Sequence, residues 1–249
     1  ILIGSDGQIA MGGRISAHGG KCYFSSGIEG DGGSIELVAV SNIEIGGVKE
    51  LNANGGDSSG TAAGNGGTIL IEAPVGTIDF DNFDVECRGG RTTFTDDGEG
   101  GTGGSATFTG ATVLLTNMTI NVTGGDAVAE GSGIGGAGGA AQIAGSTAIT
   151  VASDVVIIAD GGETHLAATA GSNGGNIKIV NLDESDATAL DFDGSVTVSG
   201  GKDAVKSTGH DGEICVAGSN TASNINLVGT NNFPISNCTE LDVWQYIHL

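Results

Sequence analysis

Short segments in which apolar and polar residues alternate recur along this chain, each directly after a pair of glycines or, in the sixth case, after Asp211-Gly212. In each segment two apolar positions flank one mostly polar position, a pattern typical of a β-strand with one buried face. Aligned on their glycine pairs, the six segments are 34–37, 68–71, 105–108, 140–143, 176–179 and 213–216. The alignment places apolar residues in register, so it predicts strands that stack one on another.

Two further alternating segments complete the repeating unit. One precedes another series of glycine pairs, and its apolar columns begin at Ile15 and Ala17. The other lies between these two strands, as in 42–45, and ends at pairs such as Gly46-Gly47 and Asp81-Asn82. Glycine and asparagine accept a positive φ, so these pairs predict sharp corners between strands.

The glycine pairs of each series recur every 34 to 39 residues, and a fixed period of this kind is the signature of a repeat architecture. Similar strands stacked at about 4.8 Å per coil form a parallel β-helix. We therefore predict an all-β, single-domain parallel β-helix, or β-solenoid, of six to seven coils with three strands per coil and long glycine-rich loops. The other all-β class, a β-sandwich, would lack columns in register.

The repeat, with a period of about 36 residues, extends over residues 1–230. Residues 231–249 lie outside it and include the only tryptophan, Trp244. We predict that this last segment caps the end of the solenoid or joins it to a neighbouring molecule. The chain starts at Ile1 without Met or a signal peptide, which we interpret as a processed product or a fragment of a longer protein.

The composition narrows the choice of partners. The chain has 8 basic and 30 acidic residues and a net charge of −22. Such a surface disfavours nucleic acid and anionic membranes as partners. No run of about 18 apolar residues is present, so we expect no membrane insertion. Self-association, other surface proteins and glycans are the partners that we expect.

Four cysteines fit an oxidising compartment. Cys215 lies on the outward column of the last strand and Cys238 in the segment beyond the repeats, so we predict a disulfide that pins this segment over the end of the solenoid. Cys87 occupies a column of small core residues, which indicates a buried thiol. Pairing of Cys87 with Cys22 is the alternative.

Three Asn-X-Thr sequons begin at Asn117, Asn121 and Asn237. Asn117 falls at a corner and Asn121 on an outward column, so we expect both side chains to be exposed. The sequons predict N-linked glycans, and hence a glycosylating secretory route. The alternative is that they are ordinary turn and surface asparagines.

Carboxylates cluster near one corner in two coils that are three repeats apart. They are Asp79, Asp81, Asp84 and Glu86 in one coil, and Asp191 and Asp193 in the other. Three coil rises, about 14 Å, are too far for one site, so we interpret them as solvated turn residues with no catalytic pair and no metal site. We expect no cofactor and at most weak surface binding of Ca²⁺. The nearby Arg88 and Arg91 are expected to be isolated.

The block G-x-G-G-x-I-x-[IL]-x-A, found at 30–39 and 64–73, resembles the repeats of large secreted bacterial β-helical surface proteins. These are the filamentous-haemagglutinin-like adhesins and autotransporter passenger domains. The resemblance implies an extracellular or cell-surface structural or adhesive protein, including a fibre subunit assembled end to end. The alternatives are a polysaccharide-active lyase or hydrolase of the same architecture, and a carbohydrate- or cation-binding module without catalysis.

Overall fold

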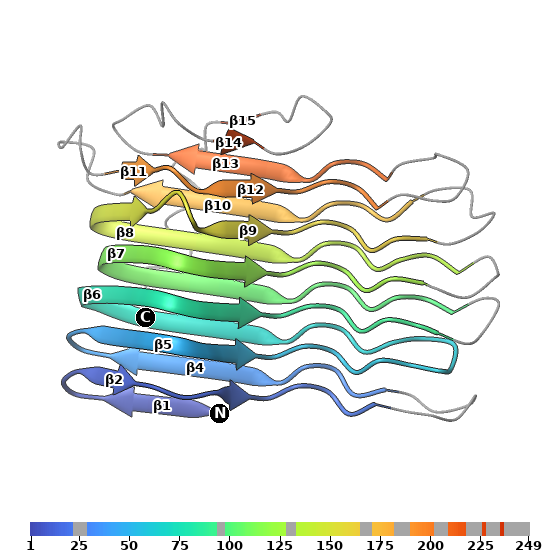
Figure 1. The fold of residues 1–249 in the computed structure, drawn as a ribbon, viewed down its shortest axis with the longest axis horizontal. Coiled ribbons are helices and arrows are strands. Elements are labelled where there is room, and N and C mark those ends of the chain that lie inside the picture. Colours follow the sequence, from blue (N-terminus) through green and yellow to red (C-terminus); the bar gives the residue numbers. More distant parts are fainter. Residues whose placement is uncertain are drawn as a thin grey trace.

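The fold was examined in a computed structural model that describes residues 1–21, 29–93, 98–127, 133–164, 171–181, 190–201, 209–217, 226–227 and 235–236. This part of the chain forms strands and connecting segments without any helix. Figure 1 shows the strands stacked in successive coils from β1 to β15. The prediction of an all-β parallel β-helix is therefore confirmed.

The strand bounds follow the predicted repeat. They are β1 (Leu2–Ser5), β2 (Ile9–Met11), β3 (Ile15–Ser16), β4 (Ser34–Ala39), β5 (Ile43–Asn52), β6 (Thr68–Glu86), β7 (Ser105–Asn121), β8 (Ala140–Val151), β9 (Val156–Ile158), β10 (Asn176–Asn181), β11 (Leu190–Phe192), β12 (Ser195–Thr197), β13 (Glu213–Ala217), β14 (Asn226–Leu227) and β15 (Ile235–Ser236). The long strands β6 and β7 each contain all three predicted segments, joined by bends at which the register shifts.

All strand pairs in the described ranges are parallel, and one path through the sheet runs β1-β4-β6-β7-β8-β10-β13-β15. The register joins equivalent residues of successive repeats. One column contains Ile35, Ile69, Ala106, Ala141, Ile177 and Ile214, and another contains Ile15, Leu51, Val85, Ile120, Ile157 and Val196. Apart from the partly buried Ile15 at the first coil, these side chains are buried, as predicted.

The core is a thin stack of aliphatic side chains with a small aromatic cluster in two neighbouring coils. Phe80 lies at 5.5 Å between ring centroids from both Phe83 and Phe108, in edge-to-face geometry. This geometry suits the quadrupoles of the rings. The cluster therefore joins β6 to β7 through side chains as well as through the backbone.

The corners use the residues that the sequence indicates. Gly47, Asn82 and Asn117 have positive φ values of 91°, 56° and 46°. The Asn117 side-chain amide donates a hydrogen bond to Asn82 Oδ1 at 3.1 Å, and the Asn117 backbone N–H donates to Asp154 Oδ1 at 2.9 Å. The corners at Asn82, Asn117 and Asp154 are thus bonded from one coil to the next.

The glycine-rich segments are more regular than the loops that we expected. On leaving the strands, each coil extends as two wavy arms that stack on the arms of its neighbours (Figure 1). We call these stacked arms the glycine slab, which comprises residues 17–20, 30–33, 53–56, 64–67, 87–90, 101–104, 122–125, 136–139, 159–162 and 172–175.

Hydrogen bonds in the slab alternate between the outgoing and returning arms. The N–H groups of Gly90, Gly101 and Gly125 donate to the carbonyl oxygens of Gly64, Gly90 and Gly101 at 2.8, 2.9 and 2.7 Å. These bonds bring backbones so close that a Cβ on Gly125 would clash with the carbonyl oxygen of Gly90. Glycine is required here by the close approach of two backbones.

Replacement of a slab glycine should therefore be costly. We expect Gly125→Ala to lower the free energy of unfolding by about 3 kcal/mol, the upper end of the usual range for point mutations. Gly13→Ala is the matched control, because a Cβ at Gly13 meets open space. Its effect should stay within about 1 kcal/mol. Urea unfolding followed by circular dichroism measures both, and equal midpoints for the two variants would contradict the role of the slab.

Cys87 is a fully buried free thiol, as the column of small residues predicts, and the alternative pairing with Cys22 is wrong. Its Sγ donates to the Ser105 carbonyl oxygen at 3.3 Å. Burial raises the pKa of the Cys87 thiol to about 12, and the negative charge of Glu86 adds to this rise. The folded protein therefore holds this proton at pH values where an unfolded chain loses it.

This difference predicts a loss of stability in alkali. Between the ordinary thiol pKa of 9.0 and about 12, the native state binds more protons than the unfolded state. The free energy of unfolding should then fall as pH rises, by up to about 1.4 kcal/mol per pH unit. Cys87→Ala should lack this contribution. Unfolding measured for both proteins at about pH 8 and pH 10 tests it, and parallel losses in the two proteins would exclude Cys87 as the cause.

Candidate functional site

A groove of about 440 Å³ lies where the last strand of each coil meets the glycine slab. Its lining comes from four successive coils, beginning with the coil of β1–β3 and ending with the segment after β7. The polar side chains that line it are Arg14, His18, Lys21, Asn52, Asn54, Asp57, Arg88, Arg91 and Asp126. The remaining lining residues are glycines, so the whole wall is polar.

The repeat explains why these residues meet. Outward positions directly before and after the glycine pairs at 19–20, 55–56, 89–90 and 124–125 form two columns, because successive coils stack in register. The column before the pair contains His18, Asn54, Arg88 and Thr123, and the column after it contains Lys21, Asp57, Arg91 and Asp126. Residues about one repeat apart in the chain thereby become neighbours across the groove.

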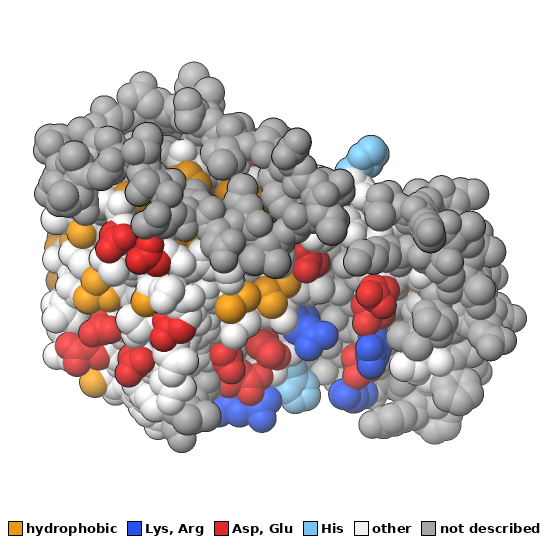
Figure 2. Space-filling model, turned by 45° about the horizontal axis from the view of Figure 1, so that its top comes forward, with side chains coloured by type: hydrophobic (Ala, Val, Ile, Leu, Met, Phe, Trp, Pro, Cys, Tyr) orange, Lys and Arg blue, Asp and Glu red, His pale blue; other side chains and the backbone are white. Residues whose placement is uncertain are grey.

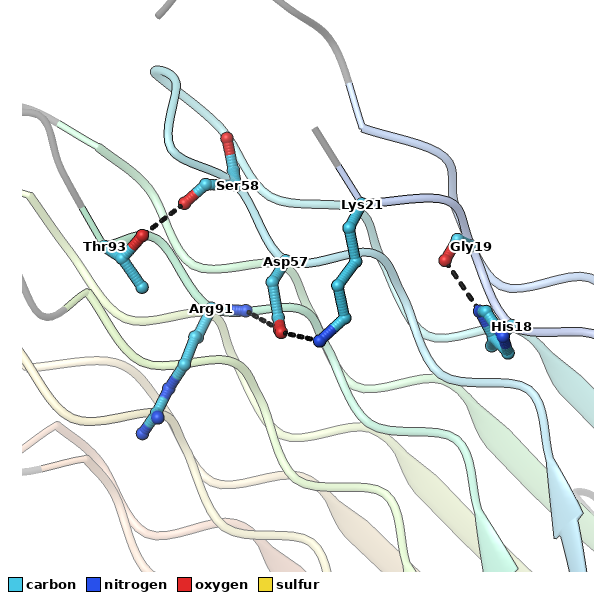
Figure 3. A network of polar contacts seen from close by, with 7 residues as sticks. All are labelled: His18, Gly19, Lys21, Asp57, Ser58, Arg91 and Thr93. Carbon is cyan, nitrogen blue, oxygen red and sulfur yellow. Dashed lines mark hydrogen bonds and ion pairs between the residues drawn. The ribbon is translucent and has the colours of Figure 1, made fainter. Parts of the chain in front are cut away.

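The second column alternates in charge. Lys21 Nζ lies 2.7 Å from Asp57 Oδ2, and Arg91 Nη2 lies 3.0 Å from Asp126 Oδ2. The Arg91 backbone N–H donates to Asp57 Oδ1 at 3.2 Å. Figure 3 shows the Asp57 carboxylate between Lys21 and the backbone of Arg91, whose side chain points away from it. The two ion pairs neutralise this column from within.

These contacts stabilise the ionised form of Asp57. Partial burial alone would raise the pKa of Asp57. The hydrogen bonds from Lys21 Nζ and the Arg91 N–H, together with the positive charges of these two residues, outweigh burial and lower this pKa. Asp57 is therefore suited to remain a charged acceptor in the groove.

The first column is held by amides. The Asn54 side chain donates to Glu86 Oε2 at 2.7 Å, and its Oδ1 accepts the Arg88 backbone N–H at 2.7 Å. Asn52 Oδ1 accepts the Asn54 backbone N–H at 3.1 Å. These hydrogen bonds fix the orientation of both side-chain amides.

Arg88 differs from the other cations of the groove. Arg14 Nε pairs with Glu50 Oε2 at 3.1 Å, and Lys21 and Arg91 have the partners given above. Within the described part of the chain the Arg88 guanidinium makes no ion pair or hydrogen bond, and the residue is exposed. The groove therefore contains one open cationic group.

The expectation that Arg88 and Arg91 are isolated is wrong. Stacking of the coils brings them together with Arg14 and Lys21 along one groove. Sequence reasoning missed this because the arginines were compared only with the carboxylates of their own coil. Aligning the residues that directly follow the glycine pairs at 19–20, 55–56, 89–90 and 124–125 reveals the column of alternating charge that starts at Lys21.

The corner carboxylates are exposed except for Glu86, which is half-buried and accepts a hydrogen bond from Asn54, and the structure does not bring the two sets together. Asp79 and Asp191 share a column, separated by Leu114 and Thr150. Asp81 Oδ1 accepts the Thr116 hydroxyl at 3.2 Å. In the ranges that the structure covers, no three His, Cys, Asp or Glu residues are grouped as a metal site would require.

The predicted glycosylation and disulfide residues are only partly covered. Asn117 is exposed, as expected, whereas Asn121 is half-buried because its Oδ1 accepts the Thr123 hydroxyl at 2.6 Å and the Thr123 N–H at 3.1 Å. Cys215 lies opposite Ser236 in the register of β13 and β15. Asn237, Cys238 and the rest of 237–249 lie outside the described residues, so the Cys215–Cys238 disulfide stays a prediction.

Comparison of the chain with protein-family models, with curated proteins and with solved structures gave no match. A search of the described residues found no helix long and apolar enough to cross a membrane.

Proposed function

We propose that the protein is an extracellular or cell-surface structural and adhesive element. The observation that carries this proposal is the continuous parallel register from β1 to β15. Each coil is joined to the next by backbone hydrogen bonds, core columns and corner side chains, which makes the stack stiff. A stiff repeat presents the same outward columns again and again, as a scaffold or an adhesive surface requires.

The location rests on the sequence features and on the resemblance to secreted adhesins and autotransporter passenger domains. The sequons at Asn117 and Asn121, together with the proposed Cys215–Cys238 disulfide, favour a secretory route and an oxidising environment. The net charge of −22 supports solubility at a cell surface.

A polysaccharide-active enzyme is the less favoured candidate. Such an enzyme needs one carboxyl group to donate a proton and a second to act as base or nucleophile. In the groove, Asp57 and Asp126 are each bound by a cationic side chain, and these contacts lower the pKa of Asp57. We infer that they are structural acceptors, and that the protein does not cleave polysaccharides.

The open edge of β1 supports end-to-end assembly. β1 pairs with β4, and among the described residues no strand pairs with its other edge. Leu2 on this strand and Ile1 directly before it are 69% and 55% exposed. An exposed apolar edge is a template for another strand, which a second copy of the solenoid can supply.

We expect the scattering mass of the protein to grow with concentration, and to grow further with salt or Ca²⁺, which screen or bridge its carboxylates. Leu2→Lys should reduce this association, because a lysine on an edge strand opposes pairing. Ile134→Lys, at an exposed position in the coil after β7 and away from that edge, is the control for added charge. A wild-type protein that stays monomeric under all these conditions would overturn the assembly proposal.

The glycoprotein proposal has its own test. Expressed through a eukaryotic secretory route, the protein should carry N-linked glycans at Asn117 and Asn121. Thr119→Ala and Thr123→Ala each break one sequon and should each remove one glycan from the intact mass. Unmodified asparagine at both positions of the wild-type protein would show that the sequons are ordinary surface residues.

A further inference from the structure

We propose that the groove binds a short acidic oligosaccharide and that Arg88 holds a carboxylate of this ligand. This inference goes beyond the proposed function, because binding at the groove depends neither on where the protein is located nor on whether copies assemble. Its basis is the chemistry of the lining.

The groove gathers cationic side chains, which are scarce in the rest of the molecule. Four cationic side chains and two carboxylates line it, whereas the whole chain has 8 basic and 30 acidic residues. Figure 2 shows the Lys and Arg side chains gathered in one part of this face, beside a histidine. Arg14, Lys21 and Arg91 are paired with carboxylates, so the Arg88 guanidinium is the positive charge that can attract an anion to this place.

Arg88 offers the contact that an anion needs. Its guanidinium makes no hydrogen bond or ion pair in the described part of the chain, while hydrogen bonds hold its backbone N–H and carbonyl groups. The Arg88 N–H is bonded to Asn54 Oδ1, and its carbonyl oxygen accepts the Gly55 N–H at 2.8 Å. A guanidinium presents a planar fork of donors that matches a carboxylate in a bidentate way. A carboxylate of the ligand would form an ion pair with the Arg88 guanidinium, which the fold leaves unpaired.

The other lining groups suit hydroxyls. Asn54 offers an amide group held in place, and Asp57 and Asp126 offer carboxylate acceptors. The Asn52 amide is buried and bonds Glu50 and the Asn54 N–H. All the lining residues are polar or glycine, so the groove has no apolar side chain to receive the side chains of a peptide or a lipid. The lining spans three coil steps of about 4.8 Å each, or about 14 Å, enough for a few sugar units in line with the solenoid axis.

The charge density of the ligand must be low. Carboxylates of the groove and of Glu86 lie beside Arg88, and the surrounding surface is strongly acidic. A densely sulfated chain or a nucleic acid would meet more repulsion than one open arginine can offset. A glycan with at most one carboxylate per sugar fits this balance.

Calorimetric titration of the full chain at low salt tests the proposal. The probes are trigalacturonate, neutral maltotriose, a heparin-derived oligosaccharide and an oligoglutamate peptide. We expect trigalacturonate to bind at least about tenfold more tightly than maltotriose, because a hydrogen bond to a charged group is worth this much or more. The heparin fragment and the peptide should bind more weakly than trigalacturonate.

Three variants locate the contact. Arg88→Ala should weaken trigalacturonate binding about tenfold or more, and Arg88→Lys should recover part of the affinity, since it keeps the charge without the fork. Lys178→Ala removes the same charge from β10, outside the groove lining, and should leave binding unchanged. The Arg88 guanidinium has no bond to lose, so thermal unfolding of its variants should match the wild type.

Several results would overturn the proposal. One is a wild-type protein that binds none of the acidic saccharides. Another is an equal loss of affinity in Arg88→Ala and Lys178→Ala, which would show that binding depends only on the net charge of the protein. Tighter binding of the heparin fragment or of the peptide would assign the groove to another ligand class. Light scattering on the same samples reports assembly separately, so failure of one proposal is distinguishable from failure of the other.

Discussion

Close approach between backbones in the glycine slab is the constraint on which the rest of this molecule depends. The arms of neighbouring coils hydrogen-bond so closely that a side chain at Gly90 or Gly125 would overlap a carbonyl group. Once these arms are fixed, the strands that enter and leave them have one register. The core columns, the corner bonds and the groove all follow from that register, because each stacks equivalent residues of successive repeats.

Stacking in register creates an electrostatic problem that the outward columns solve in different ways. Like charges in direct contact across neighbouring strands are destabilising. The column after the glycine pairs alternates in sign from Lys21 to Asp57 and Arg91. The corner column separates Asp79 from Asp191 by uncharged residues but places Glu44 directly opposite Asp79. Glu50 likewise lies opposite Asp84. In a chain with a net charge of −22, backbone hydrogen bonds and core packing therefore hold some like charges in neighbouring coils, at about 4.8 Å per coil.

The sequence predicts the strands well and the groove poorly, for a physical reason. The core columns at Ile35 and Ile15 repeat in kind, so alignment alone reveals them, and the register confirms them. The slab was predicted as loops because glycine has no side chain and leaves no apolar pattern. The groove was missed because its members change in sign and type from coil to coil. Asn121 is less exposed than its outward position predicts, because Thr123 bonds back to it.

The neighbours of Arg88 in its column distinguish this residue from the charged residues that stabilise the stack. Asn54 and Thr123 occupy the equivalent outward positions of the neighbouring coils, and neither can neutralise a guanidinium. A column that served stability alone would place a carboxylate there, as the adjacent column does with Asp57 and Asp126. The Asn54 amide instead bonds Glu86 and the Arg88 backbone. The fold thus holds Arg88 in position and leaves its guanidinium available to bind an anion.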